Sequence, residues 1–307
     1  MLYCRLMIGY DRLGTNGRFG NQLFQYAALR GIAAHHGYEF CIPPDDHHTY
    51  ANYGMHHPFK LPHLKHQGFV NKNNSPQAMY SYESLKQLNA STKNVKESVY
   101  YLDKDLFNNF EDGTNLDGFC QTEKYFKHIE DEIREDFAFK DDILEPCNEF
   151  ISTFENILFL HVRRGDNVGR EEYYRMMTFD YYERALKHFD DDAYVLVCSD
   201  DPEWCAEQDF FADDRFLVNT DVPRYDHLCL EGDGTHKNSC VPYTDLCLMS
   251  LCNGAILSSS TLGWWGAWLQ KGRTNPIIVP EHWYGPTLEK VNDCRDLYPE
   301  EWTVLPN

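Results

Sequence analysis

The second half of the chain alternates short apolar runs with segments of helical periodicity. Continuous apolar runs that fit buried strands lie at residues 157–162, 194–198, 216–218, 255–257 and 276–279. Apolar residues recur at helical spacing over residues 179–188, 202–210, 243–252 and 262–269. Strands that alternate with helices in this way form a parallel sheet that is covered on both faces. The pattern therefore predicts an α/β fold with a doubly wound domain over residues 141–307.

The first half opens with a strand, a loop with three glycines and a helix. Its predicted elements are a strand over residues 3–8, a helix over residues 21–36, a strand over residues 40–42 and a helix over residues 121–137. Strand, glycine-bearing loop and helix are typical of the start of a nucleotide-type α/β domain. Residues 44–115 show no clear pattern. We therefore expect a first Rossmann-like domain over residues 1–140.

Composition narrows the classes of partner. The chain has 307 residues, of which 42% are hydrophobic, and this length suits two domains that each have a core. Its formal net charge is −20, which argues against nucleic acid or an anionic membrane as the main partner. A polyanionic ligand would need a local group of arginines. The chain has one doubled arginine, Arg163 and Arg164.

Cysteine usage and hydropathy point to a cytoplasmic protein. The eleven cysteines include no Cys-x-x-Cys pair, so we expect reduced thiols and no zinc site. The first nine residues are too short and too interrupted for a signal peptide. Residues 246–269 carry no charge, but Asn253, Gly254 and the hydroxyls at 258–261 predict a buried helix, strand, turn and helix instead of a membrane span. Peripheral association with a membrane is left open.

The doubled arginine follows directly on a predicted buried strand. The sequence HVRRGD covers residues 161–166, and the carboxyl ends of such strands are where open α/β sheets bind ligands. Neighbouring side chains of a strand point to opposite faces, so Arg163 and Arg164 should do different jobs. One can bind an anion while the other pairs with a carboxylate such as Asp166. A surface ion pair or an adhesion tripeptide would be the alternatives; a phosphate-binding strand end is favoured.

Three segments together resemble a known family. They are residues 17–26 (GRFGNQLFQY), residues 161–166, and residues 245–265, which run from DLCLMS to SSSTLGWW. In combination they resemble the α1,2-fucosyltransferases, which belong to a wider group of GDP-fucose-dependent transferases. Residues 116–126 (LDGFCQTEKYF) are similar to a segment of the bacterial-type members.

The resemblance implies a GT-B architecture with two facing Rossmann-like domains and an inverting transfer that needs no metal or other cofactor. The carboxy-terminal domain would bind GDP-fucose and the amino-terminal domain mainly the acceptor, a galactoside-terminated glycan. The product would be an α1,2 linkage. Fucosyltransferases of other regiochemistry, α1,6 or protein O-linked, and a non-catalytic nucleotide-sugar-binding module are the alternatives.

The resemblance also implies roles for particular residues. Arg163 would contact the diphosphate, Asp166 would orient the arginines, and Asp245 would accept from guanine N1–H and N2–H. The remaining substrate-binding candidates are Gly20, Asn21, His161, Arg164, Ser259, Ser260 and Thr261. Hydroxyls and N–H groups at a helix amino terminus suit the β-phosphate. The alternatives are helix N-caps for Asn21 and Asp245, and a satisfied strand-end histidine for His161.

The general base is the remaining catalytic role. Inverting transfer needs a carboxylate that accepts the proton of the acceptor hydroxyl. Glu171 matches the position of a proposed base in the core α1,6-fucosyltransferases. Asp11 and Asp166 are the alternatives.

Overall fold

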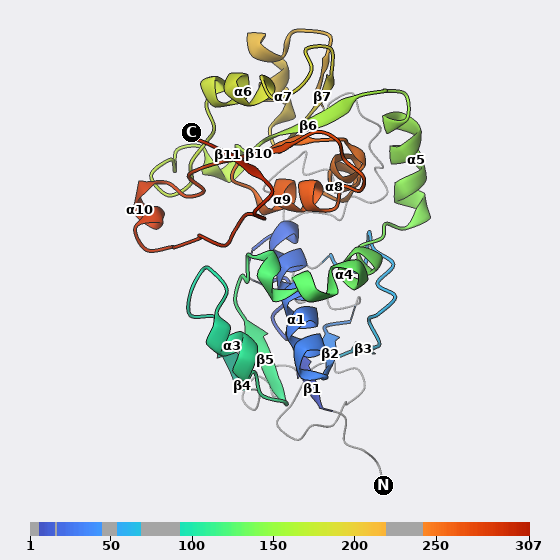
Figure 1. The fold of residues 1–307 in the computed structure, drawn as a ribbon, viewed down its shortest axis with the longest axis vertical. Helices are drawn as coiled ribbons and strands as arrows, with labels where there is room; N and C mark the ends of the chain where they lie inside the picture. Colours follow the sequence, from blue (N-terminus) through green and yellow to red (C-terminus); the bar gives the residue numbers. More distant parts are fainter. Residues whose placement is uncertain (1–5, 16, 45–53, 69–92, 219–241) are drawn as a thin grey trace. The chain divides into compact units, whose positions relative to one another are not determined.

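The computed structural model describes residues 6–15, 17–44, 54–68, 93–218 and 242–307. The chain divides into two compact units (Figure 1). The N-terminal unit contains residues 1–140 and 293–299, and the C-terminal unit contains residues 141–292 and 300–307. The segment 293–299 thus joins the first unit although it lies near the end of the chain, which no sequence pattern indicated.

The C-terminal unit is built on a parallel sheet of Rossmann type. Its strands are β6 (Ile157–Val162), β7 (Tyr194–Ser199), β8 (Phe216–Val218), β9 (Ala255–Ile256), β10 (Ile277–Pro280) and β11 (Thr303–Leu305). Their order in the sheet is β11-β10-β9-β6-β7-β8, and every pair is parallel. The first strand of the unit, β6, therefore lies in the middle, as in the dinucleotide-binding fold.

Helices cover both faces of this sheet. They are α5 (Asp141–Ile151), α6 (Phe179–Leu186), α7 (Pro202–Ala206), α8 (Pro242–Leu251), α9 (Thr261–Trp268) and α10 (Pro286–Glu289). Helices α6 and α7 lie on one face, and α5, α8 and α9 lie on the other (Figure 1). Alternate residues of β6, namely Leu158, Leu160 and Val162, pack with the buried tyrosines of α6. Alternate side chains of a strand lie on the same face of the sheet, so these three residues contribute to the same hydrophobic core.

The N-terminal unit has its own parallel sheet in the order β3-β2-β1-β5-β4. The strands are β1 (Met7–Gly9), β2 (Glu39–Ile42), β3 (His66–Gln67), β4 (Lys93–Lys96) and β5 (Thr114–Asp117). Its helices are α1 (Phe19–His36), α3 (Lys104–Asn109), the 3₁₀ turns η1 (Glu123–Tyr125) and η2 (Lys127–Ile129), and α4 (Glu130–Asp136). Helix α1 is buried along most of its length and packs against β1, β2 and the two 3₁₀ turns.

A buried carboxylate ties α4 to α1 in this unit. Asp136 is fully buried, and its Oδ2 accepts from Tyr26 Oη at 2.9 Å and from Arg30 Nε at 3.0 Å. Its Oδ1 accepts from the backbone N–H of His63 at 2.9 Å and lies 3.0 Å from His63 Nδ1. Burial of a carboxylate is costly unless it is paired and hydrogen-bonded, and the contacts of Asp136 meet both conditions.

The predicted fold class, two Rossmann-like α/β domains of GT-B type, is confirmed. The strand predicted over residues 157–162 is β6 at the same bounds, and the uncharged stretch 246–269 forms α8, β9 and α9. Two expectations are wrong. Residues 121–137 do not form one helix but η1, η2 and α4, and the first strand is Met7–Gly9 instead of 3–8, of which residues 3–5 lie outside the described part.

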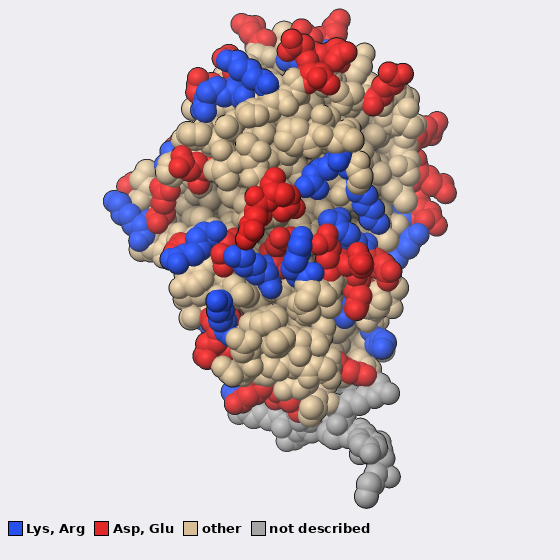
Figure 2. Space-filling model, viewed as in Figure 1, with Lys and Arg blue, Asp and Glu red and all other residues tan. Residues whose placement is uncertain are grey.

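The surface is acidic, in agreement with the formal net charge of −20. Acidic side chains gather at the end of the C-terminal unit that carries α6 and α7 (Figure 2). The exposed acidic residues there include Glu183, Asp190, Asp191, Asp192, Glu203, Asp213 and Asp214. Within the described ranges, every helix is too short or too polar to cross a membrane.

Candidate functional site

The order of strands places a topological switch point between β6 and β9. From β6 the chain continues to β7 and β8 on one side of the sheet and later returns to β9 on the other side. Ligands of such sheets bind outside the carboxyl ends of the two strands at this point. The residues there are 163–166, after β6, and 257–261, after β9. Most of the predicted C-terminal site residues therefore lie at one edge of the sheet.

Hydrogen bonds fix the two strand ends to each other and to α6. His161 Nδ1 lies 2.7 Å from Ser258 Oγ, which joins the end of β6 to the segment after β9. Tyr182 Oη donates to the carbonyl of His161 at 3.1 Å, and Tyr181 Oη donates to the carbonyl of Leu257 at 2.9 Å. The backbone at the switch point is thus held by the two buried tyrosines of α6.

His161 is buried and hydrogen-bonded at the end of β6. It is 5% exposed, and burial, helped by the nearby Arg163, lowers its pKa to about 3. The imidazole is therefore neutral at physiological pH and cannot serve as a general acid there. Its contact with Ser258 matches the alternative of a satisfied strand-end histidine, while the contact with phosphate or ribose stays a prediction.

Arg163 is held by carboxylates from two strand ends. Its guanidinium pairs with Asp166 through Nη2 and with Asp200 through Nη1. Asp200 also accepts from the backbone N–H of Arg164 at 2.8 Å. Two carboxylates that grip one guanidinium fix its plane, which preorients the fork for an anion. Asp166 lies where the bracing role requires it.

Arg164 points to the other side of the strand end. Its Nε donates to Asp201 Oδ2 at 3.0 Å, and its guanidinium lies over the ring of Trp204 at 3.6 Å from the centroid. Trp204 belongs to α7, the helix that covers the same face as Val162. The alternation of the strand thus gives the two arginines separate partners, and the interactions of Arg164 seen here are with the protein. Its substrate contact stays a prediction.

Sequence reasoning missed Asp200 and Asp201. They follow β7, the strand next to β6, so the rule that picked out Arg163 also applied to them. Two arginines face three aspartates here, a formal balance of −1. Net charge therefore does not favour an anion, and binding of a diphosphate has to rest on directional donors.

Gly165 allows the tight turn between these groups. Its φ is +34°, a region that disfavours other residues, and a Cβ atom would lie 2.2 Å from Asp200 Oδ2. The close approach of the backbone to Asp200 therefore needs a glycine.

Directional donors are present at the amino terminus of α9. Ser260 is its N-cap residue and makes no side-chain cap, while the backbone N–H of Trp264 donates to Ser260 at 3.0 Å. The N–H groups of residues 261–263 precede that first helical bond. Ser259 Oγ is buried and forms no hydrogen bond with any residue that the structure describes. The free N–H groups of a helix amino terminus, together with a hydroxyl that has no partner, can donate hydrogen bonds to the oxygens of a phosphate.

Asp245 lies near the same edge. Helix α8 begins at Pro242, so Asp245 lies inside the first turn and the N-cap alternative is wrong. Its side chain is half-buried near Cys198, close to the carboxyl end of β7: burial first, and the Asp245 carboxylate second, raise the pKa of that thiol. Reading of guanine stays a prediction.

Glu171 lies apart from the arginines. It is exposed, and its Oε1 accepts from the backbone N–H of Gly169 at 2.9 Å, which lowers the pKa of its carboxyl. In the described part of the chain no hydrogen bond or ion pair links it to Arg163 or Arg164. The carboxylate is ionised at neutral pH, as a base must be, but its catalytic role stays a prediction.

Gly20 and Asn21 belong to the N-terminal unit and lie in the first turn of α1. The N-cap of this helix is Arg18, so the N-cap alternative for Asn21 is wrong. Asn21 Oδ1 instead accepts from Gln121 Nε2 at 2.7 Å. Gln121 comes from the segment after β5, so two strand-end segments of this unit meet at the start of α1.

Glu97 is a half-buried residue at the same edge of the N-terminal sheet, directly after β4. Its Oε2 accepts from the backbone N–H groups of Phe119 at 3.0 Å and Cys120 at 2.9 Å, and its Oε1 accepts from Tyr125 Oη at 3.3 Å. Burial outweighs these bonds and raises its pKa to about 7. No sequence pattern marks Glu97, because it lies in residues 44–115, where no pattern of strands or helices could be recognised.

This raised pKa predicts how stability depends on pH. Between the ordinary value of 4.5 and about 7 the folded state binds more protons than the unfolded state, so stability falls as pH rises through this window. The loss should reach about 3 kcal/mol. Glu97→Gln removes the titration, so urea unfolding at pH 5 and pH 8 should show a smaller decline in the variant. Equal declines in stability for the wild type and the variant would contradict the raised pKa of Glu97.

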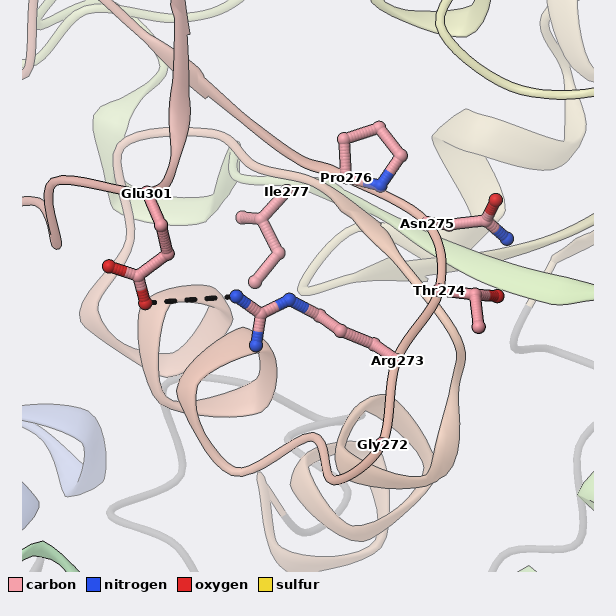
Figure 3. A pocket seen from close by; sticks show the side chains of 7 residues that line it. All are labelled: Gly272, Arg273, Thr274, Asn275, Pro276, Ile277 and Glu301. Carbon is pink, nitrogen blue, oxygen red and sulfur yellow. Dashed lines mark ion pairs between the residues drawn. The ribbon is translucent and has the colours of Figure 1, made fainter.

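A hollow of about 480 Å³ lies elsewhere in the C-terminal unit (Figure 3). It is lined by Gly272, Arg273, Thr274, Asn275, Pro276, Ile277 and Glu301. These residues surround the amino end of β10, the edge opposite to the switch point, and Arg273 pairs with Glu301 at 3.7 Å. Since parallel sheets bind ligands at the carboxyl edge, the candidate site is the switch point and not this hollow.

Comparison with known proteins places the chain among glycosyltransferases. The sequence model of glycosyl transferase family 11 matches residues 7–306. An α1,2-colitosyltransferase of Escherichia coli is 26% identical, and the match covers 94% of this chain and 96% of that protein. The O-antigen biosynthesis glycosyltransferase WbnK of Escherichia coli is 27% identical over 70% of this chain and 64% of its own length. Galactoside α-(1,2)-fucosyltransferase 1 of Bos taurus is 25% identical over 85% of this chain and 67% of that protein.

Solved structures agree on the fold. NodZ α1,6-fucosyltransferase, in a crystal soaked with GDP-fucose, superimposes with a TM-score of 0.54 at 12% identity over 87% of this chain and 93% of that chain. NodZ from Bradyrhizobium gives a TM-score of 0.52 over 85% and 92%. At this identity the likeness carries the fold and no more.

Proposed function

Because this chain belongs to glycosyl transferase family 11, we propose that it transfers fucose from GDP-fucose to the 2-hydroxyl of a terminal β-galactoside with inversion. The observation that carries the proposal is the uncapped amino terminus of α9, with the orphaned Ser259 hydroxyl, at the switch point that also holds Arg163. The activities after which two relatives are named, α1,2-colitosyl and α1,2-fucosyl transfer, support the regiochemistry.

The proposed chemistry is stabilisation of the leaving GDP. As the bond from sugar to phosphate breaks, negative charge grows on the β-phosphate. Arg163, oriented by Asp166 and Asp200, and the N–H groups and hydroxyls at residues 259–261 would donate to those oxygens. This set of donors takes the part that a metal ion plays in other transferases.

The acceptor hydroxyl has to lose a proton as it attacks. Glu171 is the proposed base because its carboxylate is exposed and ionised. Asp166 is a weaker alternative since it already pairs with Arg163, and Asp11 is buried after β1. The C-terminal unit would hold the donor and the N-terminal unit the acceptor.

A donor panel tests the proposal. Release of GDP should be seen with GDP-fucose and a β-galactoside, and linkage analysis should find an α1,2 bond. GDP-colitose is the second candidate donor, since an E. coli relative matched over 94% of this chain is named a colitosyltransferase. Transfer of colitose alone would reassign the donor, and an α1,6 product would overturn the regiochemistry.

Metal independence is a separate prediction. The described residues include no group of three or more His, Cys, Asp or Glu side chains that could hold a metal ion. We expect transfer to continue in excess EDTA, measured by release of GDP. Complete loss that added Mn²⁺ or Mg²⁺ restores would contradict the proposed stabilisation by arginine and helix.

Asp245 should select guanine. Asp245→Asn places a donor against a donor of the base, so GDP should bind about 30- to 150-fold more weakly, or about 2–3 kcal/mol. IDP lacks the 2-amino group and should lose less. Calorimetric titration of both nucleotides measures this. Asp180→Asn, in the first turn of α6, is the matched control and should change neither affinity.

Equal losses for GDP and IDP on Asp245→Asn would remove the guanine-reading role. They would leave Asp245 as a side chain that acts through the packing of α8 against α5 and α9.

A further inference from the structure

The first turn of α9 packs against the end of strand β6. Neighbouring residues of a strand lie on opposite faces, so His161 points away from the core of Val162 and α6 and toward the face that α9 covers (Figure 1). Gly263, in the first turn of α9, lies on the imidazole. A Cβ atom at this glycine would come 3.1 Å from Cγ and 3.3 Å from Cβ and Cδ2 of His161, which is closer than carbon atoms pack without strain. The helix therefore approaches the histidine more closely than a side chain at residue 263 allows.

The backbone conformation of α9 does not itself call for glycine at residue 263. Gly263 is helical, and its φ lies outside the left-handed region. A glycine inside a helix lowers the stability of the helix relative to alanine. The close contact with His161 is thus the physical reason for a glycine at this position.

The ring of His161 is held in place. It is 5% exposed, its Nδ1 lies 2.7 Å from Ser258 Oγ, and the carbonyl of the same residue accepts from Tyr182 Oη at 3.1 Å. A close-packed interior leaves little room for a ring to shift. A methyl group added at residue 263 would therefore not be accommodated by movement of the histidine alone.

The body of α9 is fixed as well. Trp264 and Trp265 are fully buried, and Trp264 packs against Trp302 with 5.3 Å between ring centroids. Residues 260–262, in contrast, are half-buried. Added volume at residue 263 is therefore expected to displace the first turn, and this turn carries the N–H groups that precede the first helical hydrogen bond.

We propose that Gly263 is a positioning residue for the diphosphate: because it has no side chain, the first turn of α9 can rest on the ring of His161 and bring the N–H groups of residues 261–263 to the same diphosphate as Arg163. This proposal rests on the proposed function, since it takes the switch point as the place of the diphosphate. Gly263 acts through the position that it allows the helix to take.

The test measures the binding of GDP and GMP to the full chain by calorimetric titration. The ratio of the Kd for GMP to the Kd for GDP gives the contribution of the β-phosphate, and changes that affect the guanosine part cancel in it. Gly263→Ala should lower this ratio about tenfold, which corresponds to the loss of roughly one charge-assisted hydrogen bond.

Gly266→Ala is the matched control. It adds the same methyl group later in the same helix, where a Cβ atom would come 2.6 Å from Met249 Cβ of α8, a tighter contact than the one at Gly263. We expect a lower melting temperature but an unchanged ratio. If only the packing of α9 mattered, Gly266→Ala would lower the ratio at least as much as Gly263→Ala.

A double-mutant cycle tests whether the effect passes through the histidine ring. His161→Asn shortens the side chain and keeps an amide that can bond to Ser258 Oγ. In this background Gly263→Ala should lower the ratio far less than it does in the wild type, because the methyl group then has room. The same comparison stays informative if Gly263→Ala alone fails to fold.

Five results would overturn the proposal. They are a wild-type ratio in Gly263→Ala, an equal fall of the ratio in Gly266→Ala, an undiminished effect in the His161→Asn background, a double variant that fails to fold although His161→Asn folds, and a wild type that binds GDP no more tightly than GMP. Failure of the proposed function looks different: the wild type would bind GDP more tightly than GMP without forming a fucosylated product, and the ratios would still decide the role of Gly263.

Discussion

Replacement of Arg163 by lysine is expected to slow transfer by about 10²–10³-fold with the fold intact. A lysine keeps the charge but offers a compact ammonium in place of a planar fork. It cannot keep the two carboxylates Asp166 and Asp200 and a diphosphate in one plane. The two arginines and three aspartates at this strand end have a formal net charge of −1, so charge alone does not attract the diphosphate. The expected loss of rate therefore comes from the directional hydrogen bonds of the guanidinium.

Single-turnover transfer from GDP-fucose measures this loss, and circular dichroism checks the fold. Arg273→Lys is the matched control, because Arg273 also pairs with a carboxylate but lies at the amino edge of the sheet (Figure 3). We expect the control to stay within a few-fold of the wild type. An Arg163→Lys protein as active as the control would remove Arg163 from the diphosphate site.

Asp136→Ala should destabilise the N-terminal unit by about 3–5 kcal/mol. The substitution leaves the buried guanidinium of Arg30 without its innermost carboxylate and deprives Tyr26 and His63 of their acceptor. Desolvated donors without partners are costly, and the cavity left behind adds to the loss.

Urea unfolding followed by fluorescence measures the change. Glu132→Ala is the control, since Glu132 pairs with the same Arg30 at 2.6 Å but has a side chain that is 47% exposed. Its loss should be below about 1 kcal/mol. Similar losses in both variants would show that the buried network is not what holds α4 to α1.

Prediction from the sequence was most accurate where burial alone determined the pattern of residues. Strand β6 is a continuous apolar run because it is buried on both faces, so its bounds could be read directly. Residues at its carboxyl end were found for the same reason. Trp264, Trp265 and Trp268 of α9, in the uncharged stretch that was predicted to be buried, all lie in the core.

The sequence failed where contacts join distant segments. Glu97 acts through backbone groups 22 and 23 residues away, and no local pattern marks such a bond. Both N-cap alternatives failed because the helices begin earlier, at Phe19 and Pro242, than the first polar candidate. The predicted helix over 121–137 has the right buried residues, Ile133 and Phe137 among them, but the chain turns between them in short 3₁₀ segments that a helical period does not distinguish.

A crystal structure of the protein with GDP tests the central claim most directly. The account predicts the diphosphate outside the carboxyl ends of β6 and β9, with its oxygens bonded to the Arg163 guanidinium and to the N–H groups at the start of α9. A diphosphate bound at the amino edge of this sheet, or in the N-terminal unit, with Arg163 still engaged by Asp166 and Asp200 alone, would contradict it.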